Sequence, residues 1–101
     1  MGNGNIVIKP SAKKFMDEKG IEDVTFNLRV EEPVGCALGI IKEIEPLYEA
    51  VKDASRYRYF RAEGKHVFIS KEIKIMGPLT LTTEGFWRMK RLALRGATVP
   101  L

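Results

Sequence analysis

The residue with the clearest chemical potential is Cys36, the only cysteine of the chain. It lies between Gly35 and Gly39 and shortly after Pro33. Proline fixes the backbone angle φ, and glycine permits positive φ and the close approach of other groups. The pattern predicts a shaped loop between two strands, with a thiol that could bind a soft metal or react as a thiolate. The alternative is an inert, partly buried cysteine, because free cysteine often packs as a small apolar residue.

Other side chains could cooperate with this thiol. His66, the only histidine, could act as the base of a nucleophile–base pair with Cys36, or it could be a polar residue at a strand edge. Acidic residues bracket the cysteine loop and could supply oxygen ligands, or they could be solvated strand edges. They are Glu31, Glu32, Glu43 and Glu45.

A second pattern combines positive charge with aromatic rings. The net charge of +4 favours anionic partners. Arginine alternating with aromatic residues is typical of single-stranded nucleic-acid binding, although a half-exposed strand has the same appearance. The basic residues are Arg56, Arg58, Arg61, Lys65, Arg88, Lys90, Arg91 and Arg95, and the aromatic ones are Tyr57, Tyr59, Phe60, Phe86 and Trp87.

Size and composition limit the function classes. The 101 residues predict a single domain, residues 1–101. The sequence contains no glycine-rich nucleotide motif, HExxH or EF-hand pattern, so a non-enzymatic protein is expected. One cysteine cannot form an internal disulfide, which favours a reducing compartment and hence a cytoplasmic location. Neither an apolar run of spanning length nor a signal peptide is present, so no membrane partner is expected.

The elements that must position these residues begin with a strand at 6–8 and a helix at 11–19. Ser11 is the expected N-cap, and Gly20 suits the left-handed position after the helix. The apolar face of this helix is predicted to contain Ala12, Phe15 and Met16. Residues 24–31 predict a strand with one wet face, because apolar residues alternate with polar ones. The apolar set is Val24, Phe26, Leu28 and Val30.

After the cysteine loop, Leu38, Ile40 and Ile44 predict a returning strand that ends at Pro46. Residues 47–55 fit a short helix or a loop. Residues 57–61 and 66–69 predict a β-hairpin around the sequence at 63–65. A single helical turn at 71–76, capped by Ser70 and ended by Gly77, precedes a strand at 79–83.

The segment 86–95 is left open between helix and strand. A helix would place Arg88, Arg91 and Arg95 on one face, whereas a strand would align Leu92 with Leu94. Together these elements predict an α+β domain that is mainly β, with mixed and antiparallel strands and one N-terminal helix.

This order of elements, with Gly35-Cys36 in the loop, resembles the HesB-like, A-type iron–sulfur carrier family. It is most similar to the small branch with a Cys-Cys or Cys-selenocysteine pair after that glycine. The resemblance covers most of the chain and implies a HesB-like fold with Cys36 as a metal ligand. Ala37 stands at the second cysteine position, and residues 94–101 lack the family's Cys-Gly-Cys.

The resemblance therefore implies a degenerate, non-enzymatic carrier of metal or thiol groups. Iron or an iron–sulfur cluster would have to be shared between the subunits of a homodimer, because alanine cannot replace a thiolate ligand. The alternative reading is a small basic binding module for nucleic acid or for an acidic protein partner.

Overall fold

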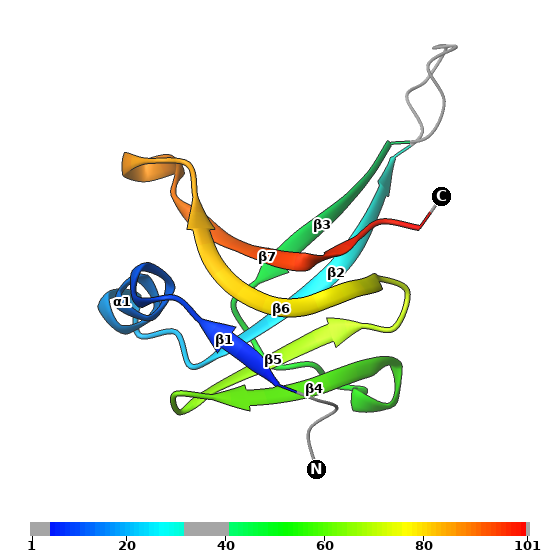
Figure 1. Cartoon of the computed structure of the whole chain (residues 1–101), viewed down its shortest axis with the longest axis horizontal. Coiled ribbons are helices and arrows are strands. Elements are labelled where there is room, and N and C mark those ends of the chain that lie inside the picture. Colours follow the sequence, from blue (N-terminus) through cyan, green and yellow to red (C-terminus); the bar gives the residue numbers. More distant parts are fainter. Residues whose placement is uncertain (1–4, 32–40, 101) are drawn as a thin grey trace.

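The computed structural model describes residues 5–31 and 41–100, which form two β-sheets and one α-helix (Figure 1). One sheet has the strand order β1-β6-β7, and the other has the order β3-β2-β5-β4. The pairs β1–β6 and β2–β5 are parallel, and the other pairs are antiparallel. The predicted α+β class, mainly β, is confirmed. The elements are β1 Ile6–Ile8, α1 Pro10–Lys19, β2 Asp23–Glu31, β3 Ile41–Leu47, η1 Ala54–Arg56, β4 Tyr57–Ala62, β5 Lys65–Ser70, β6 Lys74–Glu84, η2 Trp87–Met89 and β7 Arg91–Thr98.

Helix α1 packs on the sheets through the predicted face, since Ala12, Phe15 and Met16 are all buried. The predicted N-cap is wrong: Pro10 opens the helix and Lys9 precedes it as the cap. Proline suits this first position because its fixed φ is helical and a first-turn residue needs no N–H partner. The C-terminal prediction is confirmed, because Gly20 has a φ of +67°.

Strand β2 departs from the predicted alternation at both ends. Thr25, expected on a wet face, is buried like Phe26, and its hydroxyl donates to the carbonyl of Glu49 at 2.6 Å. Further along, Leu28 is only half-buried and Val30 is exposed. Pairing with β5 covers only the first part of β2, so neighbouring strands decide its burial as much as side-chain alternation does.

Strand β3 runs antiparallel to β2 and includes Pro46, which pairs with Phe26. The predicted end of the strand at Pro46 is therefore wrong. Since β3 is an edge strand, a residue without an N–H group can lie in it without breaking a ladder. Leu38 and Ile40, which were also assigned to this strand, lie outside the described residues.

The predicted β4–β5 hairpin is confirmed. Its two turn residues, Glu63 and Gly64, have φ values of 52° and 74°, and a type I′ hairpin turn requires positive φ at both of these positions. Lys65 follows the turn, and its buried side chain donates to the carbonyl of Ile21 at 3.0 Å and pairs with Asp17 at 2.7 Å. The hairpin is thereby tied to the end of α1.

The predicted helical turn at 71–76 is wrong. The Ser70 hydroxyl accepts a hydrogen bond from the Glu72 N–H at 3.2 Å, but the chain makes only a tight turn and enters β6 at Lys74. The ambiguous segment 47–55 contains the end of β3 and a loop that leads into η1.

Gly77 and Pro78 do not end an element, as the sequence suggested, but lie inside β6. The register between β6 and β7 shifts between Ile75 and Thr80, so these two residues form an irregularity in the strand. There β7 comes so close that a Cβ on Gly96 would lie 2.1 Å from the Pro78 carbonyl oxygen. A bulge thus accommodates the sequence that favours a break.

The open segment 86–95 becomes η2 followed by β7, and the strand alternative is confirmed for Leu92 and Leu94. Leu92 is buried and Leu94 packs against the core. One apolar cluster joins α1 to both sheets, with Phe26, Phe60, Met16, Ile69, Ile73 and Leu81 among its largest members. Within the described ranges, no helix is long and apolar enough to cross a membrane.

Candidate functional site

Strands β2 and β3 hold the two ends of the segment that contains Cys36. Their antiparallel ladder runs from the pair Thr25–Leu47 to the pair Glu31–Ile41. The predicted flanking strands of the cysteine loop are therefore present and hydrogen-bonded to each other. Cys36 and the glycines beside it belong to residues 32–40, outside the described part of the chain, so the metal-ligand assignment of Cys36 stays a prediction.

The acidic residues near this ladder surround an arginine. The Arg29 guanidinium bonds to the Glu31 carboxylate, and Arg29 lies directly opposite Glu43 in the ladder. The bond with Glu31, the charge of Glu31 and the charges of Glu45 and Glu43 raise the pKa of Arg29. Glu31, Glu43 and Glu45 therefore balance the positive charge of Arg29 across the β2–β3 ladder. Glu32 lies outside the described residues.

His66 lies at the other end of β2. It pairs with Asp23 in the parallel ladder, and its Nδ1 lies 2.5 Å from the Tyr59 hydroxyl. The two rings stack with centroids 5.8 Å apart. At about 3.3 Å per residue, β2 separates this position from the start of the cysteine segment by roughly 26 Å. The structure gives His66 an aromatic hydrogen-bond partner and no support as a base for Cys36.

The basic residues fall on separate sheets. Arg58 and Arg61 are on β4, whereas Arg91 and Arg95 are on β7. Of the two alternatives left open for residues 86–95, the helix that would align Arg88, Arg91 and Arg95 is not formed, because β7 is a strand paired with β6. Arg91 also forms an ion pair with Glu84 at 2.7 Å. These basic side chains therefore do not share one element, and nucleic-acid binding stays a prediction.

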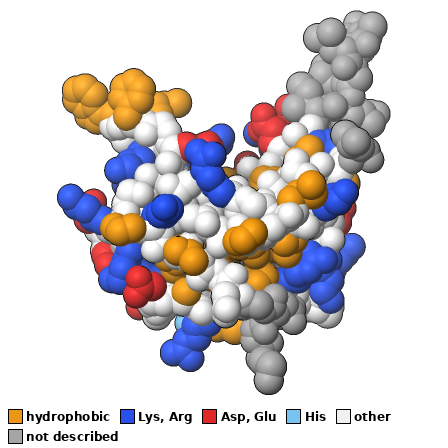
Figure 2. Space-filling model, in the orientation of Figure 1, with side chains coloured by type: hydrophobic (Ala, Val, Ile, Leu, Met, Phe, Trp, Pro, Cys, Tyr) orange, Lys and Arg blue, Asp and Glu red, His pale blue; other side chains and the backbone are white. Residues whose placement is uncertain are grey.

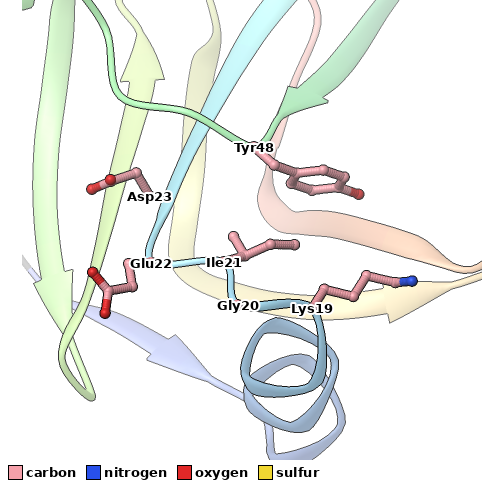
Figure 3. Close-up of a pocket in the computed structure, with 6 residues that line it drawn as sticks. All are labelled: Lys19, Gly20, Ile21, Glu22, Asp23 and Tyr48. Carbon is pink, nitrogen blue, oxygen red and sulfur yellow. The ribbon is translucent and has the colours of Figure 1, made fainter.

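An open depression of about 490 Å³ lies where α1 meets β2 (Figure 3). The carboxylates of Glu22 and Asp23 point away from Lys19 and Tyr48, with Ile21 between them (Figure 3). Side chains that diverge in this way do not converge on a common reacting or binding point. Within residues 5–31 and 41–100, no group of three or more potential metal ligands is found either.

The sequence of the whole chain adds the decisive comparison. It matches the model of the CC/Se motif containing family over residues 4–97. The chain belongs to this family. No curated protein and no solved structure matched the chain.

Membership of the CC/Se motif containing family agrees with the resemblance drawn from Gly35-Cys36 to a branch of that type. The family is named for a CC/Se motif, whereas this chain has Cys36 as its only cysteine and Ala37 directly after it. The region around Cys36 therefore remains the candidate site, with one thiol per chain.

A second surface is the β6–β7 tip, which we define as residues 85–90 and which contains the C-terminal part of the predicted arginine–aromatic pattern. Phe86, Trp87 and Met89 are 80%, 86% and 80% exposed, more than any other large apolar residue in the described ranges. Trp87 has a φ of +61°, a conformation that costs a bulky residue about 1–3 kcal/mol. The sequence signal for an exposed turn was Gly85 followed by Phe86 and Trp87, since the alternation of apolar and polar residues in the preceding strand stops there.

Proposed function

We propose that this protein is a non-enzymatic, HesB-like carrier that binds iron or another soft metal through the thiolate of Cys36. The observation that supports the proposal is the family match, which covers Cys36 and is named for a cysteine motif. The β2–β3 ladder adds support, because it fixes both ends of the segment around this thiol. Thiolates are the ligands that iron–sulfur clusters and other soft metals prefer.

The number of donors decides the form of such a carrier. One chain offers one thiol, and within the described ranges the acidic residues near β3 surround Arg29 instead of a vacant centre. The donors of a single chain therefore do not fit an iron–sulfur cluster, which takes four cysteine ligands in its common forms. Metal binding by this protein is proposed to use a homodimer, in which Cys36 of each subunit contributes one sulfur and small thiols from solution supply the other two ligands.

The test is anaerobic reconstitution of the full chain with iron and sulfide, followed by desalting, absorbance and iron analysis. We expect the wild type to retain sulfur-to-iron absorbance in a dimer fraction, and Cys36→Ser to lose it. Ala37→Ser is the matched control, since it changes the neighbouring residue and leaves the thiol. Equal iron retention by the wild type and Cys36→Ser would contradict the proposal.

A gain-of-function variant sharpens this test. Ala37→Cys adds a second thiol at the position next to Cys36 and doubles the sulfur ligands of each chain. If the segment keeps the arrangement of a metal-binding motif, the variant should retain more iron per chain than the wild type. If neither the wild type nor Ala37→Cys retained iron, the segment would not be a metal-binding site.

A further inference from the structure

The β6–β7 tip presents its apolar side chains at a corner of the molecule (Figures 1 and 2). Figure 2 shows hydrophobic side chains gathered there, apart from the other apolar patches of that face. Phe86, Trp87 and Met89 contribute them, and each is at least 80% exposed. Exposed apolar residues that are grouped in this way, instead of scattered singly, typically mark an interaction site.

The backbone of the tip is held in this shape by its own contacts. The Met89 N–H donates to the Phe86 carbonyl at 3.1 Å, and the Lys90 N–H donates to the Trp87 carbonyl at 3.4 Å. Gly85 has a φ of +76°, and a Cβ there would lie 2.5 Å from the Met89 carbonyl oxygen. The turn is therefore a specified structure that points its side chains outward, ready to bind without rearrangement.

Positive charge surrounds these apolar groups. Arg88 and Lys90 are exposed within the tip, and residues 85–90 contain no acidic side chain. The nearest acidic residue in sequence, Glu84, is paired with Arg91 at 2.7 Å at the base of the hairpin. The complementary surface is one that is negatively charged outside and apolar just beneath.

We propose that the β6–β7 tip inserts into the headgroup region of an anionic lipid bilayer. Tryptophan and phenylalanine favour this interface, and arginine and lysine can bury their aliphatic stems while their charges meet lipid phosphates. No helix within residues 5–31 and 41–100 could span a bilayer, but insertion of a surface turn does not require one.

Nucleic acid and protein partners fit the tip less well. Bases stack on aromatic rings along a groove that follows the phosphate backbone, whereas the tip is one convex turn with Met89 as its third apolar group. A protein partner would have to provide a deep apolar pocket ringed by acids. A bilayer offers both features over its whole surface.

The test uses Trp87, the only tryptophan of the chain, as its own reporter. With vesicles rich in phosphatidylserine, its emission should shift to the blue and the full-length protein should sediment with the vesicles. With vesicles of phosphatidylcholine alone, the sedimented fraction should fall about tenfold, and added salt should also weaken binding. Absence of both the shift and the sedimentation with anionic vesicles would overturn the proposal.

Matched variants locate the contact. Met89→Ala should weaken vesicle binding about fivefold to tenfold, whereas Met76→Ala, at an exposed methionine near the other end of β6, should leave it unchanged. Reversal of both tip charges, Arg88→Glu with Lys90→Glu, should weaken binding more than about tenfold, and Lys74→Glu should not. Thermal unfolding of each variant verifies that the fold is kept.

Equal binding by the Met89 and Met76 variants would overturn the assignment of the tip. The proposal would also be overturned if Trp87 emission shifted to the blue without vesicles, in parallel with dimer formation measured by sedimentation. A second copy of the chain would then cover Trp87. Quenching of Trp87 by single-stranded RNA without vesicle binding would replace lipid by nucleic acid. None of these outcomes depends on Cys36, so the metal proposal is tested separately.

Discussion

The first half of β2 is enclosed by neighbouring strands, whereas its second half has β3 as its only partner in the described chain. Residues 23–26 pair with β5, and the ladder with β3 continues alone to Glu31. Phe26 is accordingly 1% exposed, while Val30, in phase with it in the strand alternation, is 53% exposed. Burial along this strand is therefore set by the extent of the sheet around it.

The difference also separates stability from the candidate site. The enclosed half carries core residues. Beyond it, residues 27–31 and 41–45 form a two-stranded ribbon, which carries Arg29 with Glu31 and Glu43 and leads to the segment with Cys36. Changes in the ribbon should alter the surroundings of the thiol at little cost in folding free energy. Changes in the enclosed half should do the opposite.

The largest effect is expected for Phe26→Ala in the enclosed half. Removal of this fully buried ring leaves a cavity between the sheets and should lower the free energy of unfolding by about 3–5 kcal/mol. Urea denaturation followed by circular dichroism measures this loss. A loss below about 1 kcal/mol would show that the core can close around the gap and would remove the contrast between the halves.

Thr25→Ala should come next. The variant leaves the Glu49 carbonyl without the hydroxyl that donates to it at 2.6 Å, at a buried position, so a loss of about 1–3 kcal/mol is expected. Thr25→Ser keeps the hydroxyl and should restore most of the stability in the same denaturation experiment. If serine and alanine are equally destabilising, packing of the methyl group and not the hydrogen bond holds this position.

Leu28→Ala tests the boundary between the halves. Leu28 is half-buried and packs against the edge of the core, so its truncation should cost about 1–2 kcal/mol, less than Phe26→Ala. The same denaturation series provides the comparison. A cost equal to that of Phe26→Ala would place the boundary further along β2 than the exposure indicates.

A smaller, pH-dependent effect is expected at Asp17, whose ion pair with Lys65 ties the β4–β5 hairpin to the end of α1. Hydrogen bonds from Lys65 and then Lys13 lower the pKa of Asp17 below 3.8. A lowered pKa in the folded state gives stability that is present above the ordinary pKa and is lost as the pH falls through the folded value. Thermal melts of the wild type should therefore fall more steeply in acid than those of Asp17→Asn. Parallel curves would show that this pair adds nothing to stability.

The smallest effect is expected for Val30→Thr in the ribbon. The side chain is exposed and the substitution keeps a β-branched residue, so stability should change by less than about 0.5 kcal/mol. Chemical denaturation and iron reconstitution should be run on the same preparation. A large loss of stability would mean that another surface covers the ribbon in solution.

The sequence alone determined the features that depend on a few adjacent residues. The face of α1, the left-handed Gly20 and the tight turn at Glu63 and Gly64 follow from helical periodicity and from local limits on φ. It also singled out Cys36, because residue type and flanking glycines are local information. These features required no knowledge of what lies across the sheet.

The tertiary structure decided whatever depends on strands far apart in the sequence. The edge position of β3 accommodates Pro46, and the pairing of β6 with β7 keeps Gly77 and Pro78 inside a strand. The exposure of Trp87 belongs to the same class. An apolar side chain carries no local sign of whether it faces a core or a partner, since that depends on which surfaces the rest of the chain brings against it.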